Sequence, residues 1–319
     1  MLVVIAGIVL MLYPYISEYF FENRVDSEIM AYKECINKTV DQQYQRMLEQ
    51  AEEYNSYLQK SQMQLTDPFA NTGGTEEQPV YESLLRVDDS GIIGYVEIPT
   101  IGVKLPVYQG TSAGDLERGV GHLKGSSLPV GGKGTHAVLT GHTGLSQAKL
   151  LSDLTEMKEG DVFYIYVLGR QLAYEVYATS VVLPEDTEQL RIEKDKDLVT
   201  IVTCTPYGIN THRLFVHGKR IPFSEPQYQK ELSKTPVTLN SKWRSAYGRA
   251  LLAGGMFAVC LIVLLVLDIR KIIGVMLVII GCITFMSPEI VQEYYQIRTK
   301  ATLKMYDEQQ NVYEDKTED

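Results

Sequence analysis

Three side chains in the polar middle of the chain have the types needed for nucleophilic chemistry: Cys204, His142 and Arg213. A cysteine thiol, with an ordinary pKa of about 8.5, becomes a good nucleophile at neutral pH only when a base or a cation assists it. His142 could take the thiol proton, or hold the thiolate as an ion pair, and later protonate a leaving amine. Arg213 stays charged and could donate hydrogen bonds to a developing oxyanion or to substrate carbonyls.

The positions of these residues along the chain support the same chemistry. Cys204 ends a β-rich run, 198–203, at a point where the chain turns and a thiol could meet a substrate. Arg213 follows nine residues later, so adjacent strands joined by the turn could bring its guanidinium near the sulfur. His142 stands in a glycine-flanked turn that lets a substrate approach closely. No acidic residue beside His142 is identifiable, so we predict no Cys-His-Asp triad.

The other cysteines, the histidines and the net charge argue against several classes of protein. The four cysteines form no CxxC pair, which argues against a zinc ribbon or a thioredoxin motif. The five histidines lack ligand spacing, so we predict neither a metal site nor a cofactor. A net charge of −10 argues against a nucleic-acid partner, because phosphate binding needs a basic surface. We interpret Cys260 and Cys282 as small apolar residues that face lipid or another helix, and His122, His136 and His217 as structural. Cys35 lies in a charged, helix-like stretch and has no evident partner. His212 should point away from Arg213.

Residues 85–225 are predicted to form the catalytic β domain. Short β-rich runs alternate there with turn residues, a spacing typical of an all-β barrel or sandwich. A helical turn is expected within 152–158. The predicted strands are 94–98, 103–108, 135–140, 162–168, 172–183, 198–203 and 213–221.

Two segments precede this domain. Residues 17–60 are predicted to be an amphipathic helical segment, since apolar residues recur at intervals of three and four from 26 to 60. We expect this helix to pack on the neighbouring domain rather than to form a coiled coil with a partner. Residues 61–80 are predicted to be a loop, from their proline, glycine and asparagine content. Long loops of this kind often act as lids or linkers.

Apolar runs near both ends predict membrane segments. Residues 1–16 are interpreted as an uncleaved membrane anchor; a cleaved signal peptide is the alternative, although neither a basic leading region nor a cleavage site is evident. Residues 250–267 are 18 apolar residues without a charge, which predicts a transmembrane helix. A juxtamembrane linker, 226–249, would connect this helix to the β domain.

A second C-terminal span is predicted at 272–286. Its 15 residues are few for a span, but Lys271 could extend it by snorkelling. The basic pair Arg270 and Lys271 would face the cytoplasm, because positive residues favour that side. The β domain and the acidic tail, 287–319, would then lie outside the cell.

Three motifs resemble those of class C sortases. The segments TGHTG (140–144), TCTPYG (203–208) and NTHR (210–213) resemble the histidine, cysteine and arginine motifs of that family, in the expected order. The resemblance covers residues 60–225. It implies a mostly β fold, namely the sortase-type eight-stranded β-barrel, with an N-terminal helical and lid segment and transmembrane helices at both ends. Other family-like segments are Ile98-Pro99, Gly119–Leu123 and Ser127–Gly132.

The resemblance also implies a reaction and its partners. Cys204 would attack the Thr–Gly bond of an LPxTG-like sorting signal, with His142 as proton shuttle and Arg213 as electrostatic stabiliser. The acyl group would pass to a lysine amine of another pilin, without a cofactor. The implied partners are pilin subunits and the membrane, with the catalytic domain on the outer side of the cell membrane.

Asp67, Pro68 and Phe69 resemble the lid motif of the same class. In that family the aspartate approaches the catalytic arginine and the aromatic ring covers the cysteine. An Asp67–Arg213 ion pair with Phe69 on the sulfur would block the site reversibly. An ordinary loop with a turn-forming Asp-Pro pair is the alternative reading.

Three other functions remain open from the sequence. A housekeeping sortase would attach proteins to cell-wall peptide, and a hydrolytic cysteine protease would use the same thiol. A non-catalytic membrane scaffold for pilus assembly is the third, although all three reactive residues are present. The products formed from a sorting-signal peptide and competing amines would separate them.

Overall fold

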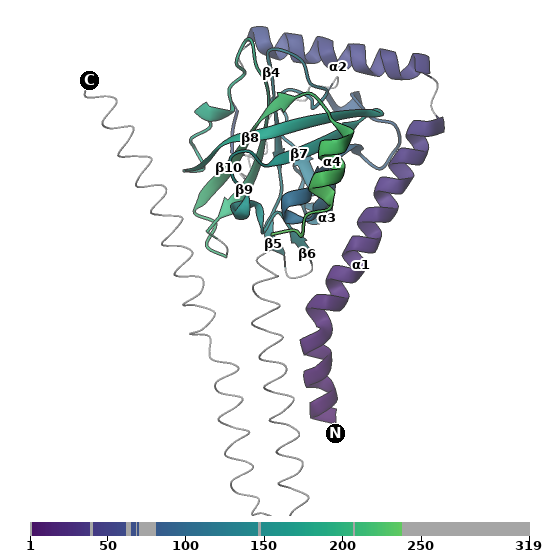
Figure 1. The fold of residues 1–319 in the computed structure, drawn as a ribbon, viewed down its shortest axis with the longest axis vertical. Helices are drawn as coiled ribbons and strands as arrows, with labels where there is room; N and C mark the ends of the chain where they lie inside the picture. The colour runs from purple at the N-terminus through teal and green to yellow at the C-terminus, as the bar shows by residue number, and fades with distance from the viewer. Residues whose placement is uncertain are drawn as a thin grey trace, which may run out of the picture. The chain divides into compact units, whose positions relative to one another are not determined.

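The computed structural model describes residues 2–38, 41–61, 65–67, 69, 81–145, 148–206 and 208–237. The central feature is a closed barrel with the strand order β1-β2-β3-β4-β9-β10-β8-β7, drawn in Figure 1. The expected mostly β fold with an eight-stranded barrel is therefore confirmed. Its strands are β1 (Ile92–Ile98), β2 (Val103–Gln109), β3 (Val120–His122), β4 (Thr135–Thr140), β7 (Val162–Val167), β8 (Arg170–Val182), β9 (Asp197–Thr205) and β10 (His212–Ile221).

The predicted strands match seven of these eight, with ends that differ by two residues or fewer. The strand that the sequence did not reveal is β3, because its three residues are too short to show an alternating pattern. It pairs in parallel with β2 and antiparallel with β4, and so completes the barrel wall beside the site.

Strand β9 holds the centre of the site wall, because it lies between β4 on one side and β10 on the other. It pairs in parallel with β4, where Thr140 faces Val202, and antiparallel with β10, where Arg213 faces Cys204. Every residue from 198 to 205 is buried. A strand covered on both faces needs no polar alternation, which explains its nearly continuous apolar sequence.

Short elements connect the strands. Helix α3 (Ala113–Arg118) begins where the Ser112 hydroxyl accepts a hydrogen bond from the backbone N–H of Asp115, a normal N-cap. The helical turn expected within 152–158 is present as η3. The remaining elements are η1 (Tyr81–Ser83), η2 (Pro99–Ile101), β5 (Thr143–Leu145), β6 (Ala148–Leu150), η3 (Leu154–Glu156), η4 (Glu188–Leu190) and α4 (Glu225–Leu232).

The helical segment expected over 17–60 is two helices, α1 (Leu2–Lys38) and α2 (Asp41–Ser61), which run in different directions in Figure 1. The predicted apolar side packs on the barrel. From α1, Tyr32 is buried; its hydroxyl donates to the Ile93 carbonyl at 3.1 Å and accepts from the Leu168 N–H at 3.0 Å. Buried side chains from the two helices are Phe21, Val25, Ile29, Tyr32, Leu48, Ala51, Tyr54 and Leu58.

One buried amide fastens α2 to the barrel. Asn55 donates to the Leu128 carbonyl at 3.0 Å and accepts from the Leu128 N–H at 2.7 Å. We expect Asn55→Ala to lower the free energy of unfolding by about 2 kcal/mol, because both backbone groups would stay buried without a partner. Urea unfolding measures the change. Ser56→Ala, at an exposed neighbouring position, is the control and should change stability by less than about 0.5 kcal/mol. Equal effects of the two substitutions would contradict the prediction.

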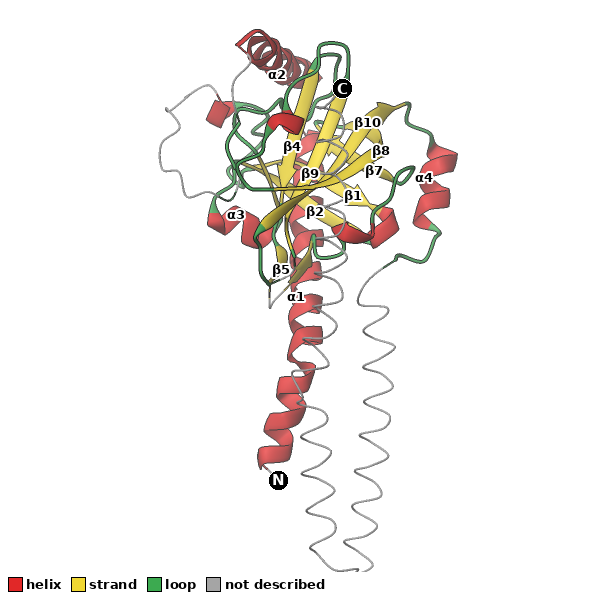
Figure 2. Cartoon of the chain, turned by 90° about the vertical axis from the view of Figure 1, so that its left-hand side faces the viewer, coloured by secondary structure: helices red, strands yellow, loops and turns green. Residues whose placement is uncertain are grey.

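Helix α4 occupies the first part of the predicted juxtamembrane linker, 226–249, and packs on the barrel. Tyr228 of α4 stacks edge-on against Tyr164, with ring centroids 4.9 Å apart, and its hydroxyl donates to Glu97 at 3.0 Å. Further along, the Val237 N–H donates to the Thr100 carbonyl at 2.7 Å. Figure 2 shows α4 at the side of the barrel.

The predicted membrane segments fall mostly outside the described residues. Within the part that the structure describes, no helix is both long and apolar enough to cross a bilayer. Residues 250–267, 272–286 and 287–319 and the rest of the linker lie outside that part. The predicted anchor, 1–16, falls at the start of α1, where the side chains of residues 1–15 are not described.

Candidate active site

Cys204 and Arg213 face each other across two antiparallel strands. Cys204 lies one residue before the end of β9, and Arg213 is the second residue of β10. The two are a direct pair in the register, so their Cβ atoms lie about 5 Å apart. Both are buried, with 8% of Cys204 and 7% of Arg213 exposed. The turn between the strands therefore places the guanidinium next to the thiol, as the spacing predicts.

His142 reaches the same place from the other side of β9. The last ladder pair between β4 and β9 is Thr140 with Val202, and the Gly141 N–H donates to the Val202 carbonyl at 3.1 Å. His142 and Cys204 each lie two residues beyond that pair, on neighbouring parallel strands. Three adjacent strands thus deliver the three predicted side chains to one end of the barrel.

Two threonine hydroxyls hydrogen-bond the turn that carries His142 to the strand that carries Cys204. The Thr203 hydroxyl donates to the Gly141 carbonyl at 2.7 Å, and the Thr143 hydroxyl donates to the Cys204 carbonyl at 2.6 Å. The two hydroxyl oxygens are also 2.6 Å apart. These contacts flank His142 and Cys204 directly and fix their backbones relative to each other. The sequence analysis did not single out either threonine, although both lie within the quoted motifs.

Residues 65–67 and Phe69 lie over this site. Both carboxylate oxygens of Asp67 accept from the Arg213 guanidinium, from Nε at 2.8 Å and from Nη2 at 2.7 Å. The Arg213 Cζ lies 5.0 Å from the centroid of the Phe69 ring, and that ring lies 5.7 Å from the His142 ring. Pro68, the third residue of the predicted lid motif, lies outside the described residues.

A small apolar cluster holds this segment in place. Leu65 and Phe69 pack against side chains of the barrel wall, and the Thr187 hydroxyl donates to the Leu65 carbonyl at 2.9 Å. The Phe69 ring therefore packs against apolar side chains of the barrel wall and also contacts His142 and Arg213. The buried members of the cluster are Leu123, Val138, Val182, Leu190, Val202 and Phe215.

The electrostatics of the site keep the thiol protonated in this conformation. Burial raises the pKa of Cys204 to about 11; the charge of Arg213 works to lower that pKa, and the charge of Asp67 works to raise it. Burial also lowers the pKa of His142, against the raising effect of Glu117. At neutral pH the pair is accordingly a neutral thiol beside a neutral imidazole.

Arg213 remains charged although it is buried. Burial works to lower its pKa, but the hydrogen bonds that it donates to Asp67 and the charges of Cys204 and Asp67 outweigh that effect and raise the pKa. Its strongest hydrogen bonds are engaged by the Asp67 carboxylate. A substrate carbonyl at Cys204 could not use these two donors while Asp67 holds them.

The remaining histidines are held in structural contacts, as the sequence analysis expects for His122, His136 and His217. Burial lowers the pKa of His122 to about 4, and its ring bonds the Tyr81 hydroxyl and the Ser127 carbonyl, both at 2.8 Å. Burial likewise lowers the pKa of His217 to about 4, and its ring bonds Thr200 at 2.8 Å. Across the described residues, no group of three or more His, Cys, Asp or Glu side chains is arranged to hold a metal ion.

Known proteins resemble this chain in both sequence and fold. A family model for the sortase domain matches residues 96–221. The solved structure "Sortase C1 of GBS Pilus Island 1" is 42% identical, with 63% of this chain and 94% of that chain covered and a TM-score of 0.57. The chain belongs to the sortase family. A sortase C structure from Streptococcus pneumoniae is 40% identical, with 63% of this chain and 99% of that chain covered and a TM-score of 0.56. Sortase D of Bacillus subtilis is 28% identical over 155 residues, which are 48% of this chain and 75% of that sortase.

Membership in this family establishes the general activity. The protein is a sortase, that is, a cysteine transpeptidase that acts on sorting signals. Sortases work at the cell surface, which is compatible with the membrane segments that the sequence predicts.

Proposed function

We propose that this sortase polymerises pilins, with Cys204, His142 and Arg213 as its catalytic residues. Two of the similar solved proteins support the pilus assignment through their names, which refer to a pilus island and to pilin substrate specificity. The observation that carries the residue assignment is the register that pairs Cys204 with Arg213, together with the parallel strand that ends at His142.

The reaction has two acyl-transfer steps. His142 takes the proton of the Cys204 thiol, and the sulfur attacks the threonine carbonyl of an LPxTG-like signal; a carbon–sulfur bond forms, and the Thr–Gly bond breaks as the glycine amine leaves with that proton. A lysine amine of a second pilin then attacks the thioester. An amide bond forms, the carbon–sulfur bond breaks, and the proton lost by the amine passes through His142 to the sulfur, which restores the thiol. Arg213 donates hydrogen bonds to the oxyanion of each tetrahedral intermediate.

Asp67 and Phe69 act as a reversible lid in this proposal. The bidentate Asp67–Arg213 pair occupies the donors that the oxyanion needs. Only 12% of the Asp67 side chain and 8% of the Arg213 side chain are exposed. The Phe69 ring lies over Arg213 and His142. A sorting signal must displace this segment before Cys204 can react, because the lid and the substrate carbonyl compete for one guanidinium.

Opening the lid should make the thiol more reactive. The double replacement Asp67→Ala and Phe69→Ala should speed labelling of Cys204 by a small thiol reagent at pH 7.5 by about 10- to 100-fold. The physical reason is that burial and the Asp67 charge both raise the thiol pKa. The pH at which labelling is half-maximal should fall below the value of the parent protein, near 11.

Asp89→Ala is the control for this experiment, since it removes an exposed carboxylate paired with Arg86 rather than with Arg213. Its labelling rate and pH profile should equal those of the parent protein. Labelling that is unchanged in the double variant would remove the lid from the proposal and leave the catalytic residues untouched.

The pilus assignment is tested by offering two amines at once. The full-length protein is incubated with an LPxTG-type peptide, a pilin domain and a cell-wall peptide, and the products are identified by mass spectrometry. We expect an acyl adduct on Cys204 and an amide bond to a pilin lysine. Transfer to the wall peptide would indicate a housekeeping sortase, and the free acid alone would indicate hydrolysis. No adduct, even with the lid replaced, would indicate a scaffold.

We also propose that segments 1–16 and 250–267 anchor the protein with the β domain outside the cell. Their apolar composition supports this placement. A protease added to intact cells should then digest the β domain. Full protection of the domain in intact cells, with digestion after lysis, would contradict the orientation.

A further inference from the structure

A hollow lies at the end of the barrel opposite Cys204. It has a volume of about 880 Å³ and is bordered by the start of β9 and the end of β10. Asp197 begins β9, seven residues before Cys204, which corresponds to about 23 Å along an extended strand. The hollow is therefore separate from the site that handles the sorting signal. Its size is within the usual range for small-molecule sites, about 300–1,000 Å³.

The lining of this hollow is unusually basic for the chain that forms it. Five cationic side chains and three carboxylates line it, so five minus three leaves a formal charge of +2. The whole chain has a formal net charge of −10. Lys196 and Lys219 also pair with Glu193 and Glu175 outside the lining, so Lys133, Arg170 and Arg220 are the cations left to attract an anion. The charged lining residues are Lys133, Arg170, Lys196, Lys219, Arg220, Glu52, Asp195 and Asp197.

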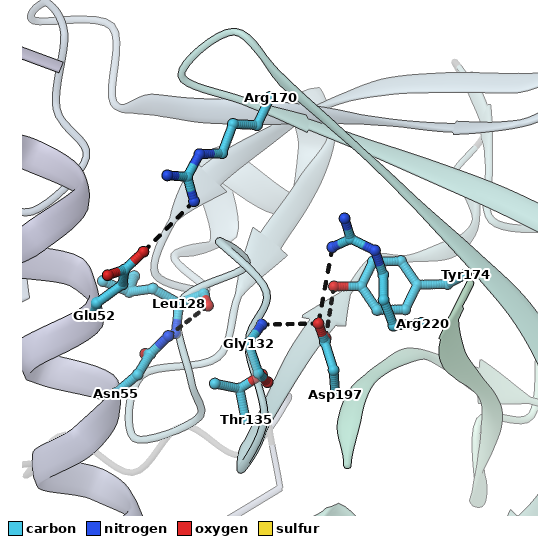
Figure 3. Close-up of polar contacts among 9 residues, drawn as sticks. All are labelled: Glu52, Asn55, Leu128, Gly132, Thr135, Arg170, Tyr174, Asp197 and Arg220. Carbon is cyan, nitrogen blue, oxygen red and sulfur yellow. Dashed lines mark hydrogen bonds and ion pairs between the residues drawn. The ribbon is translucent and has the colours of Figure 1, made fainter. Parts of the chain in front are cut away.

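Both carboxylate oxygens of Asp197 accept hydrogen bonds from other residues of the protein. Its Oδ1 accepts from the Tyr174 hydroxyl at 2.9 Å, and its Oδ2 accepts from the Gly132 N–H at 2.8 Å, as Figure 3 shows. Burial raises the pKa of Asp197, whereas the bonds from Gly132 and Tyr174 and the charge of Arg220 work to lower it. This carboxylate thus fastens the loop that follows Val130 to β8 and β9.

The two arginines of the hollow make longer contacts with their carboxylate partners. Arg220 Nη1 lies 3.8 Å from Asp197 Oδ2, which is beyond hydrogen-bond length, and its guanidinium lies 5.5 Å from the centroid of the Tyr174 ring. Arg170 Nη1 lies 3.5 Å from Glu52, with both side chains substantially exposed. Arg220 also hydrogen-bonds Tyr174. Each guanidinium has five N–H donors, so these contacts leave part of the donor capacity of both arginines for an oxyanion.

A glycine loop brings a third cation to the hollow. Gly131, Gly132 and Gly134 have φ angles of +77°, +119° and +76°, which side-chain-bearing residues rarely adopt. A Cβ atom on Gly131 would lie 2.8 Å from Arg220 Nη1, so the loop backbone sits directly against the guanidinium. Lys133 is exposed on this loop, and it makes no ion pair within 4.0 Å to any residue that the structure describes.

We propose that this hollow binds a ligand with several oxyanion groups, of the phosphate or carboxylate class, through Lys133, Arg170 and Arg220. The three cations come from separate segments of the chain: the glycine loop, the start of β8 and the end of β10. They surround a volume too large for a single carboxylate. Arginine presents paired N–H donors that match both phosphate and carboxylate oxygens. The ligand would not touch Cys204, so binding is independent of the proposed transfer to pilins.

Calorimetric titration of the full-length protein in detergent tests this site, with inorganic pyrophosphate and citrate as the two probes. We expect one saturable site for at least one probe, weakened at high salt. Lys133→Gln and Arg220→Gln should each weaken binding about tenfold or more, since each removes a charged hydrogen-bond donor. Arg86→Gln, an exposed arginine outside the hollow, is the control and should leave binding unchanged.

The outcomes separate the two ligand sources and the proposal itself. Binding of pyrophosphate but not citrate assigns a phosphate ligand, and the reverse assigns a carboxylate ligand. Because Lys133 is exposed, Lys133→Gln should fold normally and cleave a sorting-signal peptide at the parent rate, even if Arg220→Gln disturbs Asp197. No saturable binding of either probe, or equal binding by the parent and Lys133→Gln, would overturn the proposal.

Discussion

Cys204→Ser should lower the kcat/KM for cleavage of a sorting-signal peptide by about 10⁴-fold or more. Serine keeps the size of the side chain but not its acidity, and the site offers little help in removing a hydroxyl proton. Burial already raises the pKa of the thiol to about 11, and the pKa of His142 is lowered by burial. A fluorogenic LPxTG-type peptide measures the rate, and mass spectrometry should find no acyl adduct on the variant.

Cys35→Ser is the matched control. Cys35 is the other cysteine among the described residues and lies on α1, where its thiol contacts Asp88 at 3.5 Å. The substitution is chemically identical but far along the chain from the site, so cleavage should continue at the parent rate. If Cys204→Ser kept a tenth of the parent activity, or if Cys35→Ser lost as much as Cys204→Ser, Cys204 would not be the nucleophile.

The pairing of Cys204 with Arg213 could be predicted because it is local. Two β-rich runs separated by a short turn form an antiparallel hairpin, and residues at equal distances from the turn then face each other. The approach of His142 could not be predicted in this way. It depends on parallel pairing between β4 and β9, whose strands are separated by more than fifty residues, and no local pattern specifies such a partner.

Three features could not be predicted from the sequence, because each depends on more than a local pattern of residues. Strand β3 is three residues long and is stabilised by its two neighbours rather than by its own pattern. The separation of α1 from α2 is hidden because both helices keep apolar residues at intervals of three and four. Glu117 acts on His142 only through the placement of α3, and nothing in its own surroundings in the sequence indicates that role.

The lid contact shows the opposite case, in which a motif was sufficient to name the partners. The family resemblance predicts the Asp67–Arg213 ion pair, which is present. It places the Phe69 ring on the Cys204 sulfur, whereas the contacts found for that ring are with Arg213 and His142. Asp67 and Arg213 are 146 positions apart, so spacing alone could not have joined them.

Arg213→Lys should lower the kcat/KM for peptide cleavage by about 100-fold or more. Lysine keeps the positive charge, which works to lower the pKa of Cys204, but it cannot present two parallel N–H donors. The bidentate contact with Asp67, at 2.8 and 2.7 Å, shows that Arg213 can present both donors to one pair of oxygens. An oxyanion that replaces the carboxylate would use the same two donors.

The effect of hydrogen-bond geometry can be separated from the effect of charge when Asp67 and Phe69 are both replaced by alanine. In the background of Asp67→Ala and Phe69→Ala, Arg213→Lys should leave the pH profile of Cys204 labelling nearly unchanged while peptide cleavage falls. Arg213→Gln should also move that profile to higher pH, because loss of a positive charge raises the pKa of a nearby thiol. Arg86→Lys, at an exposed position outside the site, is the control. Full cleavage activity in Arg213→Lys would show that the charge suffices, and the oxyanion role would have to be withdrawn.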